Sequence, residues 1–419
     1  MRGAACRERK AKALAAALTL AAVTAGCGRA ASGTPVINLY NAPQENLGAI
    51  VERCNRLAGG RYRIALNTLP RDADGQREQI VRRLAAGDSG LDVLGLDVTW
   101  TAELAEAGWI RPWRGRYARQ ARQGTLRAPL ATATWKGRLY AAPYNTNVQL
   151  LWYRSDLIPD PPSTWDGLIR ESARLAAAGK PHNGEVTGAP YEGIVVWFNS
   201  LVASAGGAVL NPAGDAVALG EPALQALRTM RAFGRSAAAD PSLPNMREDD
   251  VRLAMESGRA AYQINWPFVY ASMAANRPDM LPHFKWAPYP GITGPGKAPL
   301  GGANFAVSAY SRHPGRAFQA ALCLRDAESQ KIAAIRDGLP PTLRSLYDDP
   351  ELARAYPMRQ AILDALADPA IRPQTPTYQN VSTVTSNVLS PPAAIDPPRT
   401  LKELRELISK ALESKGVLP

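Results

Sequence analysis

The eight residues Leu91–Val98, LDVLGLDV, form a nearly continuous apolar run of strand length. Such a run is typical of a strand that is buried on both faces of a sheet. Before it, the hydrophobic pattern predicts strands at 36–40 and 62–66, with helices at 47–57 and 79–86. The alternation of strand and helix predicts an α/β domain with a mostly parallel sheet.

Asp97 lies at the end of this central strand, directly before Thr99 and Trp100. Open α/β sheets bind ligands at the carboxyl ends of their strands, so a carboxylate here could line a cleft. The same carboxylate could instead cap the helix predicted at Thr101–Gly108. Position alone favours the cap.

The remainder of the chain predicts a second, helix-rich region. Residues Leu139–Arg154 are extended and apolar, interrupted by PYNTN at 143–147, and are expected to connect two lobes. Beyond them, a strand is predicted at Ala260–Asn265 and an amphipathic helix at Thr400–Glu413. A chain of 419 residues is long enough for two or three domains.

The first 27 residues have the pattern of a lipoprotein signal. A basic start is followed by the apolar run Ala13–Ala25 and by small residues before Cys27. The run is shorter than the roughly 20 residues that a membrane-spanning helix needs. We therefore expect residues 1–26 to be removed and Cys27 to carry lipid, on the extracytoplasmic face of the cell membrane. Plain secretion without lipid is the alternative.

The cysteine and charge patterns narrow the class of protein further. If Cys6 leaves with the signal and Cys27 is lipidated, Cys54 and Cys323 remain as one pair, for which a disulfide is expected. Three histidines in loop-like sequence predict neither a metal site nor a histidine-dependent catalytic triad. The net charge is +12, but no run of five basic residues predicts nucleic-acid binding.

Several segments together resemble the solute-binding lipoproteins of sugar ABC importers. They are the leader, Leu91–Trp109, Leu139–Leu157 and the INWPF sequence of Ile264–Phe268. Within that family the chain is most similar to the mycobacterial trehalose-binding lipoproteins of the LpqY type. That similarity extends over Cys54, Glu192-Gly193, Trp197-Phe198, Gly301-Gly302, Cys323–Asp326, Gly338–Pro340 and Arg372-Pro373.

The resemblance implies a periplasmic-binding-protein-like fold of the maltose-binding-protein type, with two α/β lobes around a ligand cleft. The first lobe would comprise residues 34–145 and 300–346. The second lobe would comprise 149–299 and 347–419, joined to the first by crossover hinge segments. Cys54 and Cys323 would both lie in the first lobe, so their disulfide would leave the hinge free. No cofactor is implied.

The resemblance also implies a sugar site, built from aromatic rings and planar polar groups that bind hydroxyls in pairs. Trp197 is a secondary candidate, since its helix position also suits the core. At Glu45 the family has Asp, and Asn145 departs from the family pattern PxTTN. The implied ligand-binding residues are Glu45, Asp97, Asn147, Glu248, Trp266, Phe268, Gly302, Arg372 and Trp197.

The implied function is capture of an α-linked disaccharide, trehalose first, and its delivery to the permease of an ABC importer by a monomeric protein. The alternatives on the same fold are maltose, another α-glucoside or a glycerophosphodiester. An enzymatic function is a further alternative, because Asp97 and Glu248 could form the carboxylate pair of a glycosidase.

Overall fold

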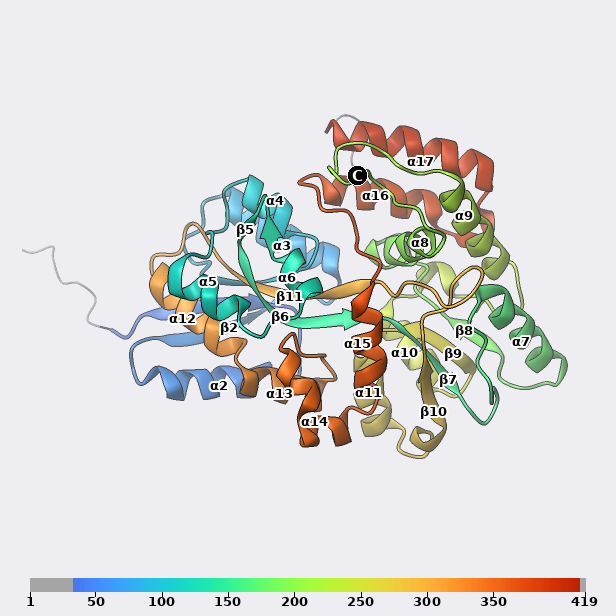
Figure 1. The fold of residues 1–419 in the computed structure, drawn as a ribbon, viewed down its shortest axis with the longest axis horizontal. Helices are drawn as coiled ribbons and strands as arrows, with labels where there is room; N and C mark the ends of the chain where they lie inside the picture. Colours follow the sequence, from blue (N-terminus) through green and yellow to red (C-terminus); the bar gives the residue numbers. More distant parts are fainter. Residues whose placement is uncertain (1–32, 415–419) are drawn as a thin grey trace, which may run out of the picture.

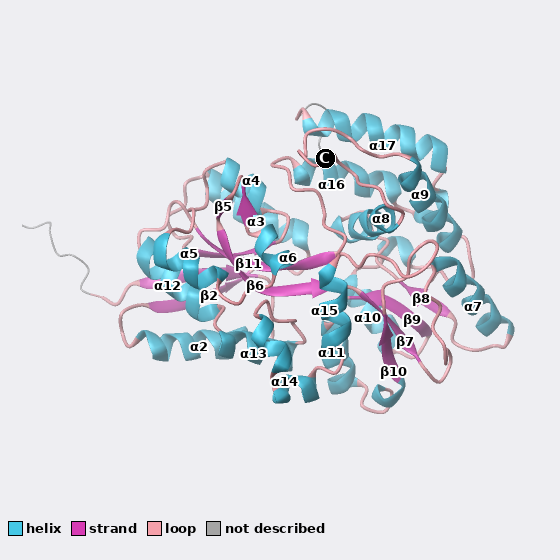
Figure 2. Ribbon diagram, in the orientation of Figure 1, coloured by secondary structure: helices cyan, strands magenta, loops and turns pink. Residues whose placement is uncertain are grey.

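Two β-sheets organise the part of the chain that the computed structural model describes, residues 33–414. The predicted signal peptide and Cys27 lie outside these residues. Each sheet is flanked by its own helices, so the chain forms two α/β lobes side by side (Figures 1 and 2). The predicted two-lobed α/β fold is confirmed.

The first lobe is built on a five-stranded sheet with the order β2-β1-β3-β11-β6. Strand β1 is parallel to β2 and β3, whereas β11 is antiparallel to both β3 and β6. Four of the five strands therefore run in one direction, as predicted for a mostly parallel sheet, and β11 runs against them. The strands are β1 (Val36–Asn41), β2 (Arg63–Thr68), β3 (Val93–Asp97), β6 (Ala141–Val148) and β11 (Leu300–Val307), with a separate hairpin of β4 (Thr134–Trp135) and β5 (Arg138–Leu139).

Two helices of the first lobe differ from the sequence prediction in how they begin. Helix α3 begins at Ala73, earlier than predicted, because Asp72 caps it by accepting from Gly75 N. Helix α4 has Trp100 at its N-cap, so Asp97 is not the cap that position alone favoured. The helices are α2 (Leu47–Ala58), α3 (Ala73–Ala85), α4 (Thr101–Glu106), α5 (Gly115–Arg122), α6 (Arg127–Thr132), α12 (Pro314–Leu324) and α13 (Ala327–Asp337).

The second lobe is built on a four-stranded sheet with the order β10-β7-β9-β8. Its strands are β7 (Leu150–Arg154), β8 (Asn183–Glu185), β9 (Ala260–Asn265) and β10 (Phe284–Ala287). The α-helices of the rest of the chain are α7 (Trp165–Ala177), α8 (Glu192–Ser204), α9 (Glu221–Gly234), α10 (Glu248–Glu256), α11 (Phe268–Asn276), α14 (Pro350–Ala355), α15 (Arg359–Ala367), α16 (Tyr378–Leu389) and α17 (Pro397–Leu412). Short 3-10 turns are η1 (Leu243–Asn245), η2 (Leu281–His283), η3 (Arg344–Asp348) and η4 (Pro392–Ala394).

The chain crosses between the two sheets within single extended segments. Strands β6 and β7 are separated only by Gln149, yet they belong to different sheets. Strand β11 brings the chain back from the second lobe to pair with β3 and β6. In Figure 1, β6 ends at the boundary between the lobes. The ends of β3 and β6 and the start of β11 therefore face the second lobe.

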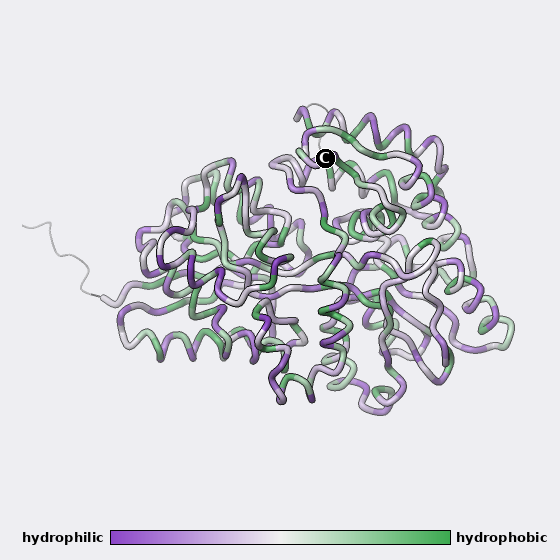
Figure 3. The backbone as a smooth tube through the Cα atoms, in the orientation of Figure 1, coloured by the Kyte–Doolittle hydropathy of each residue, from purple (hydrophilic) through white to green (hydrophobic). Residues whose placement is uncertain are grey.

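Each lobe has its own hydrophobic core. One cluster of buried side chains comes from residues 37–144 and 305–333, the other from 148–300 and 334–411. Outer helices such as α17 alternate hydrophobic and hydrophilic residues along their length (Figure 3). A disulfide joins Cys54 on α2 to Cys323 on α12, inside the first lobe. Among residues 33–414, no helix is long and apolar enough to cross a membrane.

Glu185 at the end of β8 makes the stability of the second lobe depend on pH. Glu185 is 1% exposed. Its burial, together with the negative charge of nearby Asp240, raises the pKa of its carboxyl to about 8. Below about pH 4.5 the carboxyl is protonated in both the folded and the unfolded state. As pH rises towards 8, only the unfolded state releases the proton, so stability falls.

We expect Glu185→Gln to remove this loss, which is on the order of 4 kcal/mol between pH 5 and pH 8.5. Urea unfolding at pH 5 and pH 8.5 would measure it as the difference between variant and wild type. The exposed Glu78, replaced by Gln, serves as the matched control. Equal pH dependence in wild type and Glu185→Gln would show that this carboxyl does not hold its proton in the folded state.

Candidate functional site

Arg372 forms the centre of a polar cluster between the two lobes. It lies in the segment before α16 and is 5% exposed. Its Nη2 is 3.4 Å from Oδ1 of Asp97, at the end of β3 in the first lobe. Its Nη1 donates to Oε1 of Glu192, at the start of α8 in the second lobe, over 2.6 Å. Its guanidinium therefore bridges a carboxylate of each lobe.

Glu192 is buried and is held by three donors. Tyr378 donates its hydroxyl to Glu192 over 2.6 Å, and Ser382 donates to the other carboxylate oxygen. Burial raises the pKa of Glu192, and Arg372 opposes that rise. Burial alone would lower the pKa of Arg372, but Asp97 and Glu192 raise it overall. The arginine thus stays charged and is fixed in orientation by its two acidic partners.

Two glycines beside this arginine, Gly301 and Gly302, let other parts of the chain approach the backbone closely. Gly301 pairs with Asn147 across β11 and β6. A Cβ on Gly301 would lie 2.8 Å from the ring of Trp266 and 3.4 Å from Cβ of Asn147. Gly302 has a φ of +126° and lies against the backbone of Asn145, so only glycine fits there without strain. The backbone carbonyl of Leu300, the residue before Gly301, accepts from Arg372 over 3.3 Å.

We expect Gly301→Ala to displace Trp266, because its methyl group would overlap the indole ring. The result should be a shift in tryptophan emission and a loss of ligand affinity of about tenfold. Gly294→Ala is the matched control, since nothing lies within 4 Å of a Cβ at that glycine. An unchanged emission spectrum in Gly301→Ala would place the indole away from this backbone.

Glu248 and Trp266 form the second-lobe side of the cluster. Glu248 begins α10 and accepts from the hydroxyl of Tyr191 over 2.6 Å. Its backbone carbonyl accepts from Asn265, the last residue of β9. Burial raises the pKa of Glu248, while hydrogen bonds from Tyr191 and from Trp266 lower it. The carboxylate and the indole are therefore neighbours.

Several buried polar atoms in this region have no hydrogen-bond partner among the described residues. They include Nε of Arg372, Oδ1 of Asn147 and Oγ1 of Thr146. A buried donor or acceptor without a partner is costly, so such atoms usually bind water or a ligand. Together they provide one N–H donor and two oxygen atoms. A molecule with several hydroxyl groups can accept from the N–H and donate to the oxygen atoms.

The structure brings together Asp97, Asn147, Glu248, Trp266, Gly302 and Arg372, six of the nine predicted ligand-binding residues. Glu45 is exposed in the loop after β1. Phe268 begins α11 and packs its backbone against Gly338. Trp197 is 2% exposed and packs against Trp165 and Phe233, so the structure places it in the second-lobe core.

Sequence reasoning did not identify Glu192, Tyr378 and Tyr191 as parts of the site. Glu192 carried a usable signal, because it is an acid at the start of the apolar segment 192–204. A buried carboxylate needs a cation or several donors. Nothing in the sequence indicated which cation it would meet. Among the described residues, no cluster of His, Cys, Asp or Glu could hold a metal ion.

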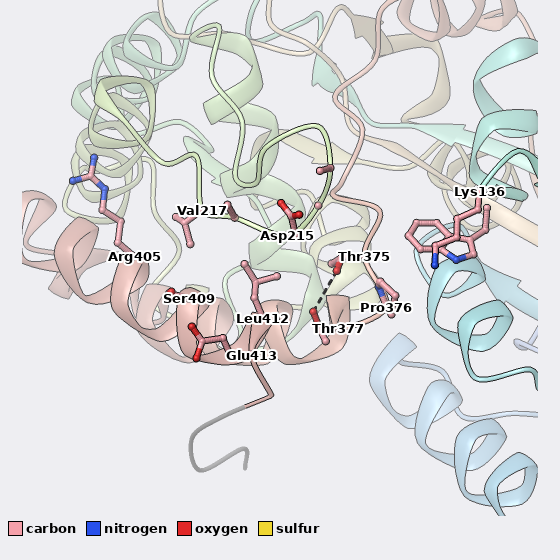
Figure 4. A pocket seen from close by; sticks show the side chains of 14 residues that line it. Lys136, Asp215, Val217, Thr375, Pro376, Thr377, Arg405, Ser409, Leu412 and Glu413 are labelled. Carbon is pink, nitrogen blue, oxygen red and sulfur yellow. Dashed lines mark hydrogen bonds between the residues drawn. The ribbon is translucent and has the colours of Figure 1, made fainter.

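A separate groove of 790 Å³ lies at the edge of the interlobe region. Figure 4 shows Lys136 of the β4–β5 turn on one side and α17 with the loop of Asp215 and the Thr375–Thr377 segment on the other. None of the six clustered residues lines this groove. It is therefore distinct from the candidate site.

Two α/β lobes with charged, amide and aromatic side chains between them define a two-lobed solute-binding protein. The chain matches the family of bacterial extracellular solute-binding proteins over residues 64–331 and belongs to that family. Members of this family bind a solute without transforming it, so the chain is not an enzyme. The glycosidase alternative is thereby excluded.

Individual relatives agree with this assignment. A Deinococcus radiodurans protein named probable ABC transporter-binding protein is 27% identical over 328 residues, 74% of this chain and 76% of that protein. The maltose-bound MalE3 structure of T. maritima has a TM-score of 0.81 and 26% identity, and the match covers 91% of this chain and all of that one (100%). The GacH receptor of Streptomyces glaucescens, solved without ligand and with acarbose, has a TM-score of 0.80, 18% identity and coverage of 91% and 100%. At that identity the likeness shows the fold alone.

Proposed function

We propose that this protein captures an α-linked disaccharide, with trehalose as the first candidate, and delivers it to the permease subunits of an ABC importer. The observation that carries the proposal is the Arg372 centre. A fixed arginine lies between two carboxylates and keeps an unpartnered Nε, and it donates to Leu300, whose neighbour Gly301 lies against the Trp266 indole. The free Nε–H can donate to one sugar hydroxyl and a neighbouring carboxylate can accept from the next, while the indole ring covers an apolar sugar face.

Each clustered residue has a role in this proposal. Asp97 and Glu248 accept hydrogen bonds from sugar hydroxyls, Asn147 donates and accepts, and Arg372 donates. Trp266 stacks on a glucose ring, and the Gly302 backbone approaches the sugar closely. Glu45 would accept from a sugar hydroxyl, Phe268 would border the ligand, and Trp197 would support the site from the core.

The proposal extends to the lobes and the anchor. We propose a first lobe of residues 34–145 and 300–346 and a second of 149–299 and 347–419, which close over the sugar, although Ala334 and Leu346 of the first set pack into the second core. The protein acts as a monomer, tethered by a lipid on Cys27 after removal of residues 1–26.

Maltose is the second candidate. The T. maritima relative was solved with maltose, and both disaccharides present glucose rings with similar hydroxyls. A glycerophosphodiester fits less well, because phosphate favours several cations or a helix N-terminus, whereas this cluster has one arginine and three carboxylates.

A thermal unfolding panel tests the proposal with trehalose, maltose, mannitol and glycerophosphocholine. A ligand at a hundredfold excess over its Kd stabilises the folded state by about 2.7 kcal/mol, which raises the Tm. We expect an increase with trehalose and a smaller one with maltose. An increase with glycerophosphocholine alone would contradict the disaccharide proposal.

A further inference from the structure

Charged residues on the rim of the two lobes pair reciprocally. The loop between β2 and α3 in the first lobe carries Arg71 and Asp72, and the start of α10 in the second carries Arg247 and Asp249. Arg71 Nη1 lies 3.3 Å from Asp249 Oδ2, and Arg247 Nη1 lies 3.7 Å from Asp72 Oδ2. Each lobe thus offers one cation and one anion to the other.

Asp72 is held in place from within its own lobe. Its Oδ1 accepts from Gly75 N over 2.8 Å as the N-cap of α3, which leaves Oδ2 to face Arg247. Next to it, Asp74 accepts from Gln379 of α16 over 3.1 Å, a further contact between the lobes. The first-lobe side of the contact is therefore a rigid helix start rather than a free loop.

Arg247 also contacts the candidate site in its own lobe. Its guanidinium carbon lies 4.9 Å from the centre of the Tyr191 ring, within the range of a cation–π interaction. Tyr191 in turn donates its hydroxyl to Glu248 over 2.6 Å. One side chain thus contacts both Asp72 of the opposite lobe and the ring that holds Glu248.

We propose that Arg247 is a positioning residue that makes the placement of Glu248 depend on contact between the lobes. Asp72 keeps Arg247 over Tyr191, and Tyr191 keeps the Glu248 carboxylate in its site. When the lobes separate, the ion pair between Asp72 and Arg247 is lost. Arg247 is then no longer held over Tyr191, and the Glu248 carboxylate loses its fixed position. The inference rests on the proposed function, since it assumes that Glu248 binds the sugar.

An unusual property follows from this arrangement. Trehalose and maltose carry no charge, so their direct contacts with the protein depend little on salt. The rim pairs are solvent-exposed, and salt screens such pairs over about 10 Å at 0.1 M. Affinity for a neutral sugar should therefore fall as ionic strength rises.

The test is calorimetric titration with trehalose and with maltose at 20 mM and 500 mM NaCl. We expect wild-type affinity to fall three- to tenfold at high salt. Asp72→Asn keeps the helix cap, because Asn caps as well as Asp, but loses the charge. It should bind three- to tenfold more weakly at low salt and show a smaller further loss at high salt than wild type, because only the Arg71–Asp249 pair remains to be screened. Asp279→Asn, which removes an exposed pair with Arg277 inside the second lobe, is the matched control.

A conservative substitution separates positioning from a merely structural role. Arg247→Lys keeps the positive charge that faces Asp72 and leaves the cap of α3 intact, but it presents no planar guanidinium to the Tyr191 ring. The salt dependence should remain while affinity stays below wild type. Wild-type affinity that is independent of salt, or Asp72→Asn binding as tightly as wild type, would overturn the proposal.

Small-angle X-ray scattering without sugar gives an independent reading. We expect the radius of gyration of wild type to be larger at 500 mM than at 20 mM NaCl. At both salt concentrations, Asp72→Asn should have a larger radius than wild type has at 20 mM NaCl. A radius that changes with neither salt nor variant would overturn the contact between lobes on which the inference depends. If neither sugar binds wild type, the proposed function fails, while scattering still decides whether these pairs hold the lobes together.

Discussion

Arg372→Ala is expected to abolish measurable sugar binding and to lower the free energy of unfolding by about 3–5 kcal/mol. Two effects combine. The ligand loses its only cationic donor in the cluster, which should weaken binding by at least tenfold, or about 1.4 kcal/mol. In addition, Glu192, which is 8% exposed in the wild-type protein, loses its cation and keeps only the Tyr378 and Ser382 hydroxyls as donors. Calorimetric titration and urea unfolding measure the two effects separately.

A second substitution separates binding from folding. Adding Glu192→Gln to Arg372→Ala removes the unpaired buried charge, so stability should largely return while binding stays absent. Arg344→Ala, at an exposed position, controls for loss of a positive charge. Normal trehalose and maltose affinity in a folded Arg372→Ala protein would show that the ligand binds elsewhere.

Replacing both Cys54 and Cys323 with Ala is expected to cost about 2–4 kcal/mol of stability and to leave ligand affinity unchanged. The bond connects residues 269 positions apart, so it greatly restricts the unfolded chain. Both cysteines lie on helices of the first lobe, away from the contact between lobes. Urea unfolding and sugar titration of the double variant measure the two properties.

Wild-type protein in reducing agent provides the control for this variant, because it loses the bond without a change of side-chain size. The two samples should have similar stability. A large loss of affinity in a folded, bond-free protein would contradict the view that the disulfide leaves lobe movement free.

Much of the fold was predictable because hydrophobic periodicity is strong in the buried strands. The strand predicted at Ala260–Asn265 has those limits in the structure, and the central apolar run contains β3. The segment 139–154 was predicted as a connection between lobes, but it also supplies β6 and β7 to two different sheets. That division depends on pairing with β11 and β9, which are remote in sequence.

The site was predictable only in part, for a related reason. Asp97 could be placed at a strand end from the local sequence, whereas its ion pair with Arg372 joins residues that the sequence separates widely. Tyr191 and Glu192 were missed as site residues because their roles depend on partners in α10 and α16. Local patterns predict what a residue can do, and tertiary packing decides which partner it meets.

The central claim is that the interlobe cluster binds an α-linked disaccharide. Calorimetric titration of the wild-type protein with trehalose, followed by maltose, tests it most directly. We predict saturable binding of one trehalose per chain, tighter than that of maltose. Saturable binding of maltose alone would support a disaccharide site but show that maltose, not trehalose, is the ligand. Absence of binding heat with both sugars, in protein shown by circular dichroism to be folded, would contradict the claim.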